Sequence, residues 1–261
     1  NAGYGSAQSR TTSDESAKIA RTAMKQLLKQ ALMGLGLLGP AKRAAWFATR
    51  GIGRNSTLTQ QYLARGDAKK LHIGCGLNML PGWMNSDFYP PSRDALHFDA
   101  TKPFPLPDDT FDYVFSEHMI EHIPYRDGLT MLKESHRVLK RGGRIRISTP
   151  NFAFLVGLYA GQADPRRDAY IKWSTANFVN WAPYPDDIFV INNFVRDWEH
   201  RFIYDEKSLR HALESAGFTN VVKCELQTSA SPALCGLENE SRMPEGFLRL
   251  ETLTLEGTKA P

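Results

Sequence analysis

The chain has 261 residues, a length that fits one large α/β domain with an appendage. Hydrophobic residues make up 42% of it and charged residues 23%, which predicts a packed core and argues against global disorder. The formal net charge of +4 is too small to indicate nucleic-acid binding, and the three cysteines, which have no metal-type spacing, favour a reduced, cytoplasmic setting.

Before residue 70 we expect a disordered end, 1–13, followed by a helical extension, 14–69. Between 14 and 50, apolar residues recur at helical spacing and a basic stripe lies on the opposite face. The stripe consists of Lys18, Arg21, Lys25 and Lys29. It indicates the solvated face of a packed helix, with a helix on an anionic membrane surface as the alternative. No apolar run reaches the roughly 18 residues that a membrane span needs.

From residue 70 the sequence predicts alternating strands and connections. Strands are expected where short apolar runs stop at loops or acids, at 71–73, 83–86, 96–98, 111–115 and 144–148. One helix is expected to begin near Ser116 and a longer one to run from 125 to 139. Asp205 is expected to cap a last helix that ends at Gly217, before two final strands at 221–226 and 250–255.

Two of the connections, 77–82 and 88–95, are too short for a crossover helix, which takes about a dozen residues or more. We therefore expect two helices that would cover the sheet to be reduced to turns. Both faces of a parallel sheet need cover. The N-terminal helix is accordingly expected to cover the face that these turns leave open.

Three strand ends carry residue types that suit a nucleoside ligand. Gly74 and Gly76 follow the first strand, where a backbone without a Cβ can approach a ligand closely. Asp87 ends the second strand, placed for ribose hydroxyls, and Asp99 ends the third, placed for an adenine amine. Each residue alone is more simply a turn or cap residue, but the ordered series predicts a ligand site at the carboxyl ends of adjacent strands.

Five consecutive segments, 71–76, 81–87, 98–100, 105–116 and 139–150, resemble the motifs of class I S-adenosylmethionine (SAM)-dependent methyltransferases. The similarity is greatest to a bacterial branch often associated with sugar and surface-polysaccharide biosynthesis. It implies SAM as the cofactor and an α/β, Rossmann-like fold with a seven-stranded sheet whose last strand is antiparallel. The positions that match the family's cofactor-binding residues are Gly74, Cys75, Gly76, Asp87, Phe88, Asp99, Ala100, Ser116, Glu117 and His118.

The chain departs from the family pattern at His72, which stands where an acid usually precedes the first glycine by two positions. The methionine amino group of SAM would then rely on backbone or water. A dinucleotide-binding Rossmann enzyme is the competing interpretation. Its fingerprint requires a third glycine where this chain has Met79, which disfavours it.

The segment 117–122 contains His118-x-x-Glu121-His122. On a regular helix this spacing is typical of a zinc protease, but its position after a strand at the cofactor site argues against that, and no metal is expected. A hydroxyl that attacks a sulfonium methyl must lose its proton, and a positioned base adds roughly 10²- to 10⁴-fold to the rate. Glu121 and His122 are the candidate bases of this segment.

Residues 151–204 form an aromatic-rich insertion that we expect to cap the substrate site. Most of its aromatic residues are expected to pack, yet flat aromatic faces ringed by polar groups also suit sugars. His200 is a third candidate catalytic residue, and the candidate substrate contacts are Asn151, Trp198, Arg201 and Tyr204. Residues 235–246 are expected to form a second, more mobile rim.

The sequence thus predicts a SAM-dependent methyltransferase whose core comprises a SAM-binding part, 70–150, and a C-terminal part, 205–261. Its expected acceptor is a hydroxyl of a sugar in a glycan, glycolipid or nucleotide-sugar. A natural-product or other small-molecule methyltransferase and a non-catalytic SAM-binding subunit are the alternatives. The expected partner is a small-molecule or glycan acceptor and not a nucleic acid, and the sequence does not specify an oligomeric state.

Overall fold

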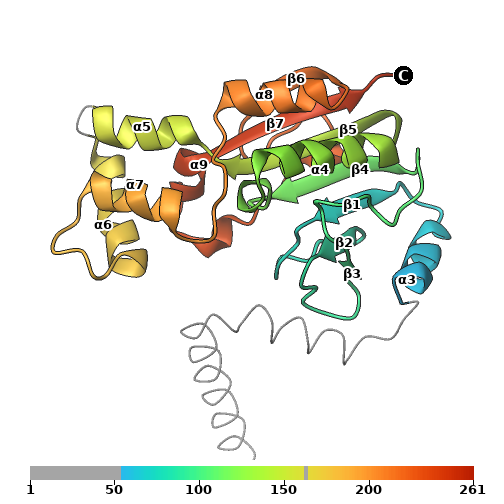
Figure 1. The fold of residues 1–261 in the computed structure, drawn as a ribbon, viewed down its shortest axis with the longest axis horizontal. Helices are drawn as coiled ribbons and strands as arrows, with labels where there is room; N and C mark the ends of the chain where they lie inside the picture. Colours follow the sequence, from blue (N-terminus) through green and yellow to red (C-terminus); the bar gives the residue numbers. More distant parts are fainter. Residues whose placement is uncertain (1–53, 162–163) are drawn as a thin grey trace, which may run out of the picture. The chain divides into compact units, whose positions relative to one another are not determined.

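The computed structural model describes residues 54–161 and 164–261 (Figure 1). The predictions for the terminus 1–13 and for the basic helix within 14–50 lie outside the described residues. Residues 55–261 form one compact unit. Among the helices of the described part, none is long and apolar enough to cross a membrane.

A seven-stranded sheet forms the centre of this unit, with the strand order β3-β2-β1-β4-β5-β7-β6. The last strand, β7, is antiparallel to both of its neighbours, and the other pairs are parallel. This confirms the predicted fold class. The strands are β1 (Lys70–Ile73), β2 (Met84–Asp87), β3 (Leu96–His97), β4 (Phe111–Glu117), β5 (Leu139–Pro150), β6 (Phe218–Cys224) and β7 (Thr252–Lys259).

The described helices divide between the sheet and a cap. Helices α3 (Arg54–Leu63), α4 (Tyr125–Val138) and α8 (Glu206–Ser215) accompany the sheet, and α5 (Phe152–Ala160), α6 (Pro165–Phe178), α7 (Asp187–Arg196) and α9 (Phe247–Glu251) gather at one end of it (Figure 1). Three short 3₁₀ helices are η1 (Ile120–His122), η2 (Pro232–Leu234) and η3 (Glu240–Arg242).

The helix starts follow the sequence closely. Asp205 begins α8 with a reciprocal capping box, in which its side chain accepts from the Ser208 amide. In the cap, Asp164 and Asp186 accept amides at the starts of α6 and α7 in the same way. These caps explain why the insertion, although rich in aromatic residues, forms defined helices.

Several predicted boundaries are wrong. Strand β5, predicted at 144–148, runs from Leu139 to Pro150. Strand β4 continues to Glu117, because Ser116 and Glu117 pair with Ile147 and Ser148 of β5, and only the three-residue η1 follows where a helix was expected. The last two strands are β6, which begins at Phe218, and β7, which runs from Thr252 to Lys259. The predicted strand 221–226 begins and ends later than β6, and the predicted strand 250–255 begins too early because α9 occupies the residues up to Glu251.

One face of the sheet is apolar. Ile145 and Ile147 of β5 and Leu253 and Leu255 of β7 belong to a core cluster that also includes buried residues of α4 and α8. Tyr62 of α3 joins this cluster by stacking on Phe111, with ring centroids 6.5 Å apart. The helices therefore stabilise this face by hydrophobic burial.

The opposite face is covered by the long connection between β6 and β7. Phe115 alternates with Val114 along β4, so its side chain points to this second face. There it packs with Trp83 and with Leu234 of η2, both buried. The connections 74–83 and 88–95 contain no helix, as predicted. Within the described residues, the cover that was expected from the N-terminal helix is provided here by the β6–β7 connection.

A buried arginine anchors this connection. Arg146 of β5 is fully buried and donates from Nε to Glu238 and from Nη1 to Glu256, each at 2.6 Å. Ser148 donates to the same carboxylate of Glu238 at 2.8 Å. Residues 235–246 were expected to form a mobile rim. The burial of Glu238 in this segment, and its ion pair with Arg146, were not predicted.

Candidate active site

The loop after β1 adopts the glycine-dependent conformation that the sequence predicts. Gly74 has φ +71° and Gly76 has φ +49°, values that favour glycine. A Cβ on Gly74 would collide with the side chain of Met119. The intervening Cys75 is buried, and its amide donates to the Ser86 carbonyl at 2.9 Å, which ties the loop to β2.

Asp87 joins the ends of β1 and β2. One of its carboxylate oxygens accepts from the Gly76 amide at 2.9 Å, and the other accepts from the Tyr89 amide at 2.7 Å. The next residue, Phe88, is partly exposed and packs edge-on against Tyr89. The predicted residues of the first two strand ends are thus brought together.

The third strand end has a more local arrangement. Asp99 accepts from the amide and the hydroxyl of Thr101, at 2.9 and 2.7 Å, which is the turn-forming role that a lone aspartate most often has. Ala100 packs against the core cluster. Asp99 lies two residues beyond β3, which pairs with β2, so it belongs to the same edge of the sheet as Asp87.

The end of β4 carries buried polar residues. Ser116 is buried and its hydroxyl has no hydrogen-bond partner within the described structure. Glu117 accepts from the Asn239 amide at 3.0 Å and lies 3.4 Å from Nη2 of Arg242. Burial raises the pKa of Glu117, against the opposing charge of Arg242.

His72, the departure from the family pattern, has a structural role. Its Nδ1 lies 3.1 Å from Oδ1 of Asn85 on the neighbouring strand, and the ring is buried. Burial lowers the pKa of His72 to about 4, so the side chain is neutral at physiological pH. It cross-links β1 and β2 beneath the glycine loop.

His118 connects this edge to the predicted catalytic residues. It follows β4 with φ +45°, and its amide donates to the Ser148 carbonyl. Its ring lies 3.0 Å from Thr252 Oγ1 through Nε2 and 3.5 Å from Glu121 Oε1 through Nδ1. Burial holds the pKa of His118 well below its usual range.

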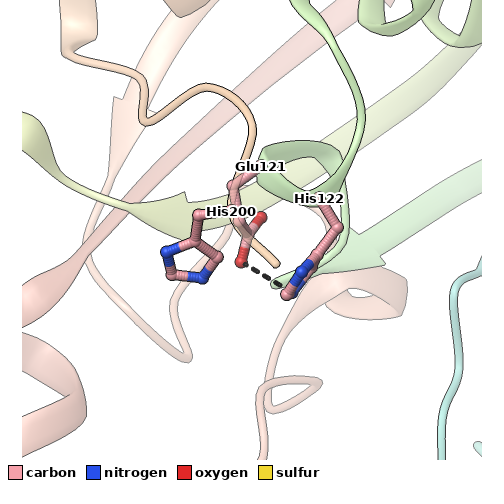
Figure 2. Close-up of side chains that lie close together, drawn as sticks. All are labelled: Glu121, His122 and His200. Carbon is pink, nitrogen blue, oxygen red and sulfur yellow. Dashed lines mark ion pairs between the residues drawn. The ribbon is translucent and has the colours of Figure 1, made fainter. Parts of the chain in front are cut away.

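The three predicted catalytic residues meet in space. Figure 2 shows the Glu121 carboxylate beside the imidazole rings of His122 and His200. Glu121 Oε1 lies 3.8 Å from His122 Nε2, and the two imidazole rings are 4.9 Å apart. His122 and His200 are far apart in the sequence, and the structure brings them into one cluster.

The electrostatics of this cluster follow from its burial. Glu121 is fully buried, and burial raises the pKa of its carboxyl group to about 8, opposed by a hydrogen bond from Thr149 at 3.0 Å. Burial also lowers the pKa values of His122 and His200. At neutral pH the three side chains are therefore mostly uncharged.

These residues line a cavity of about 290 Å³ between the sheet edge and the cap. Aromatic side chains of the cap form its walls, namely Tyr170, Trp173, Phe178 and Trp198. His118, Arg242 and Glu251 are also in its lining. The predicted substrate contact Trp198 thus lies in the cavity, beside His200.

Several lining residues escaped the sequence-based prediction of the site, among them Glu251 and Arg242. Glu251 ends α9, is buried, and accepts a hydrogen bond from the Tyr170 hydroxyl. Burial raises the pKa of Glu251 to about 7. An acid between the leucines of 250–255 was the available signal, but this segment was interpreted as a strand. Arg242 ends the short 3₁₀ helix η3, whose position the sequence did not predict.

The other predicted substrate residues lie elsewhere. Arg201 and His200 line a second hollow of about 440 Å³, together with residues of α5, α7 and α8. Asn151 caps α5 by accepting the Ala153 amide. Tyr204 is fully buried in the core beside Tyr125 and Phe202, so in this structure it packs and lines neither hollow.

Comparison with known proteins agrees with the predicted chemistry for part of the chain. Residues 76–147 match the family model described as Methyltransferase domain, which confirms the methyltransferase motifs of that segment. Over 55 residues, or 21% of the chain, the sequence is 44% identical to a demethylmenaquinone methyltransferase of Lysinibacillus sphaericus (strain C3-41). The chain covers 22% of that relative.

Solved structures show a similar course of the chain at low identity. Phosphoethanolamine N-methyltransferase 2 of Haemonchus contortus, in complex with S-adenosylhomocysteine and phosphomonomethylethanolamine, is 12% identical with a TM-score of 0.42, over 81% of this chain and 53% of that one. A SAM-dependent methyltransferase of Archaeoglobus fulgidus is 17% identical with a TM-score of 0.43, over 79% and 94%. The chain thus spans about half of the first of these proteins. At such TM-scores the similarities carry no argument about function.

Proposed function

We propose that this protein is a SAM-dependent methyltransferase that transfers a methyl group to a hydroxyl of a sugar. The observation that carries the proposal is the position of His118. It follows the strand whose end belongs to the predicted cofactor edge, and its ring lines the cavity that contains Glu121, His122 and His200. Cofactor edge and acceptor cavity are therefore neighbours, as methyl transfer requires.

The predicted cofactor edge has donors and acceptors that fit SAM. Each oxygen of Asp87 accepts one backbone amide, and a carboxylate oxygen has a second lone pair with which to accept a ribose hydroxyl. At Gly76, no atom of the described residues other than its chain neighbours lies within 4 Å of the position that a Cβ would take, which leaves room at the end of β1 for the methionine part of the cofactor. The unpartnered hydroxyl of Ser116 lies at the end of β4, between these residues and the cavity.

The cavity walls support a sugar acceptor. Trp173, Phe178 and Trp198 offer flat apolar faces, and carboxyl and imidazole groups stand among them. Sugars combine apolar C–H faces with hydroxyl rims, so this mixture of aromatic and polar groups suits them. The cavity volume of about 290 Å³ is enough for one small acceptor group.

In the proposed reaction, the acceptor oxygen attacks the methyl carbon in line with the sulfonium. A C–O bond would form as the C–S bond breaks, SAM would be released as the neutral thioether S-adenosylhomocysteine, and the hydroxyl proton would pass to a neutral imidazole of the cavity lining. We propose that the cluster of Glu121, His122 and His200 activates this hydroxyl. Alignment of the two reactants supplies much of the remaining acceleration, roughly 7 to 11 kcal/mol in favourable cases.

A different small molecule is the second candidate acceptor. The curated relative that matches over 55 residues is named a demethylmenaquinone methyltransferase, and an aromatic-walled cavity would also hold an aromatic ring. In either case the cofactor site and the activating cluster are the same. A panel of acceptors that contains sugars, nucleotide-sugars and aromatic hydroxyl compounds, with release of S-adenosylhomocysteine as the readout, separates these candidates.

Calorimetric titration with SAM and with S-adenosylhomocysteine tests the core of the proposal. We expect both to bind the folded protein, and Asp87→Ala to weaken binding by about 1 to 3 kcal/mol, the cost of unpaired polar groups. Asp67→Ala, at an exposed acid on the chain before β1, is the matched control and should bind normally. A folded protein that gives no heat with either ligand would refute the assignment.

A further inference from the structure

We infer that Glu121, His122 and His200 form a binding site for a divalent transition-metal ion. Each residue offers one ligand atom, and the three atoms lie within 4.8 Å of one another. In Figure 2 the Glu121 carboxylate and the two rings converge on a common space. From the sequence no metal was expected, because the His-x-x-Glu-His segment follows a strand at the predicted cofactor site. The structure has a three-residue 3₁₀ helix there and adds His200 from the cap.

The Glu121 carboxylate has one satisfied oxygen and one free oxygen. Oε2 accepts from the Thr149 hydroxyl at 3.0 Å. Oε1 has no hydrogen-bond partner within the described structure, although Glu121 is fully buried. It faces His122 Nε2 at 3.8 Å and His118 Nδ1 at 3.5 Å. A buried carboxylate oxygen without a donor requires a compensating group, and a cation between Oε1 and the imidazoles provides one.

His200 is oriented as a metal ligand. Its Nδ1 donates to the Phe194 carbonyl at 2.6 Å, which assigns the ring proton to Nδ1 and leaves the lone pair on Nε2. Metal-binding histidines usually donate their second ring nitrogen to a carbonyl or carboxylate in this way. Thr149 plays the corresponding role for Glu121. The set therefore includes both the ligands and the partners that orient them.

The backbone fixes the relative position of the two segments that carry the ligands. The Glu121 carbonyl accepts from the amides of Arg201 and Phe202, at 2.7 and 3.2 Å. His200 is thus attached, one residue before this pairing, to the 3₁₀ helix of Glu121 and His122. A ligand set held by main-chain hydrogen bonds needs little rearrangement to close on an ion.

The donor chemistry indicates the class of ion. Two imidazoles and one carboxylate suit Zn²⁺, Fe²⁺, Co²⁺ or Mn²⁺ rather than Mg²⁺ or Ca²⁺, which prefer oxygen ligands. Three protein ligands leave a coordination position open toward the cavity, which His122 and His200 line. Given the proposed function, an acceptor hydroxyl bound at that position would become more acidic, which is how the cluster would activate it.

Metal binding can be measured without any knowledge of the acceptor. The full chain is first dialysed against a chelator, then titrated with ZnCl₂ by calorimetry and with CoCl₂ by visible absorption. We expect one ion per chain, with a d–d spectrum for Co²⁺ that reports nitrogen and oxygen ligands. His200→Ala and Glu121→Gln should each weaken binding by more than roughly 100-fold, and Thr149→Val, which keeps all three ligands, by roughly 10- to 100-fold.

Two matched variants serve as controls. Glu251→Gln removes a carboxylate from the same cavity, and His211→Ala removes an exposed histidine of α8, and both should bind the metal normally. Asp87→Ala should lose SAM affinity and keep metal affinity, so a failed cofactor assignment and a failed metal site give different results. Absence of stoichiometric binding by the folded native chain, or binding that survives both Glu121→Gln and His200→Ala, would overturn the inference.

Discussion

Two pairs of buried glutamates behave differently in this molecule. Glu238 and Glu256 surround Arg146, and each contacts its guanidinium at 2.6 Å. Glu121 and Glu251 line the aromatic cavity, and within the described residues neither forms an ion pair with a lysine or arginine. Burial instead raises the pKa values of Glu121 and Glu251 to about 8 and about 7.

The difference shows how a buried carboxylate behaves when an arginine of the same chain is paired with it and when no such cation is present beside it. Around Arg146 both carboxylates are paired with one guanidinium of the same chain, and this arrangement holds the β6–β7 connection on the sheet. Around the cavity the carboxyl groups remain able to exchange a proton or accept a ligand. The first pair is therefore structural, and the second is available for chemistry.

Removal of the internal cation should give the largest effect on stability. Arg146→Met leaves Glu238 and Glu256 buried without a partner, and breaking a buried ion pair from one side costs about 3 to 5 kcal/mol. Urea denaturation at neutral pH, followed by circular dichroism, measures the free energy of unfolding. Lys223→Met, which breaks an exposed ion pair with Glu206, is the control and should change it by less than about 1 kcal/mol. Equal stability of both variants would contradict a structural role for Arg146.

The β6–β7 connection, which Arg146 anchors, also contacts the sheet through an apolar side chain, and this contact can be tested. Leu234 is fully buried against Trp83 and Phe115 on the second face of the sheet. Leu234→Ala should reduce the free energy of unfolding by about 2 to 5 kcal/mol, from lost burial and the cavity that remains. Leu77→Ala, at an exposed leucine, is the control and should have little effect. A Leu234→Ala variant as stable as the native protein would mean that the β6–β7 connection does not cover the sheet.

The sequence predicts the sheet, and the meeting of its glycine and aspartate residues at one edge, for a local reason. Gly74, Gly76 and Asp87 are defined by strand ends, and parallel strands bring their carboxyl ends to one edge whatever the rest of the chain does. The seven strands and the antiparallel last strand follow from the family resemblance, and the structure confirms them. The exact limits of β4 and β7 depend instead on pairing with β5, which no local pattern contains.

The cavity could be predicted only in part, because its residues come from distant segments. Glu121, His122 and His200 were identified by residue type, and their meeting depends on the pairing of the Glu121 carbonyl with Arg201 and Phe202. Glu251 became a lining residue because α9 turns it toward Tyr170. Tyr204 has the composition of a binding residue and is nevertheless core, since burial depends on packing that aromatic content does not reveal.

The uncompensated carboxyl groups should make stability depend on pH. The folded-state pKa of Glu251, about 7, lies above its ordinary value of 4.5, so between these values the unfolded chain releases a proton that the folded protein keeps. Stability should therefore fall as pH rises through this window, by about 1.4 kcal/mol for each unit of pKa difference, and stay level above it. Arg242, Tyr170 and Glu121 contribute to the environment of this carboxyl group.

Glu251→Gln isolates this contribution. The amide resembles the protonated acid in shape and cannot ionise, so the variant should gain stability relative to the native protein as pH rises from 5 toward 8 (roughly the window set by the pKa difference). Melting temperatures measured across this range, for both proteins, give the difference curve. Glu245→Gln, at an exposed acid, should follow the native curve. Parallel curves for Glu251→Gln and the native protein would show that Glu251 is ionised throughout.

The smallest expected effect concerns the hydroxyl that serves Glu251. Tyr170 is buried and donates to this carboxyl group, and burial raises the pKa of Tyr170, so it stays a donor at every pH of interest. Tyr170→Phe should cost about 1 kcal/mol at pH 6, where the acid is mostly neutral, and about 2 kcal/mol at pH 8, since hydrogen bonds to charged groups contribute more. In a protein that already carries Glu251→Gln, the effect of Tyr170→Phe should no longer depend on pH. Tyr159→Phe, at an exposed tyrosine of the cap, is the control and should have no effect. A loss that is equal at both pH values would mean that Glu251 does not change its protonation there, and the contrast between the two pairs of glutamates would then rest on Glu121 alone.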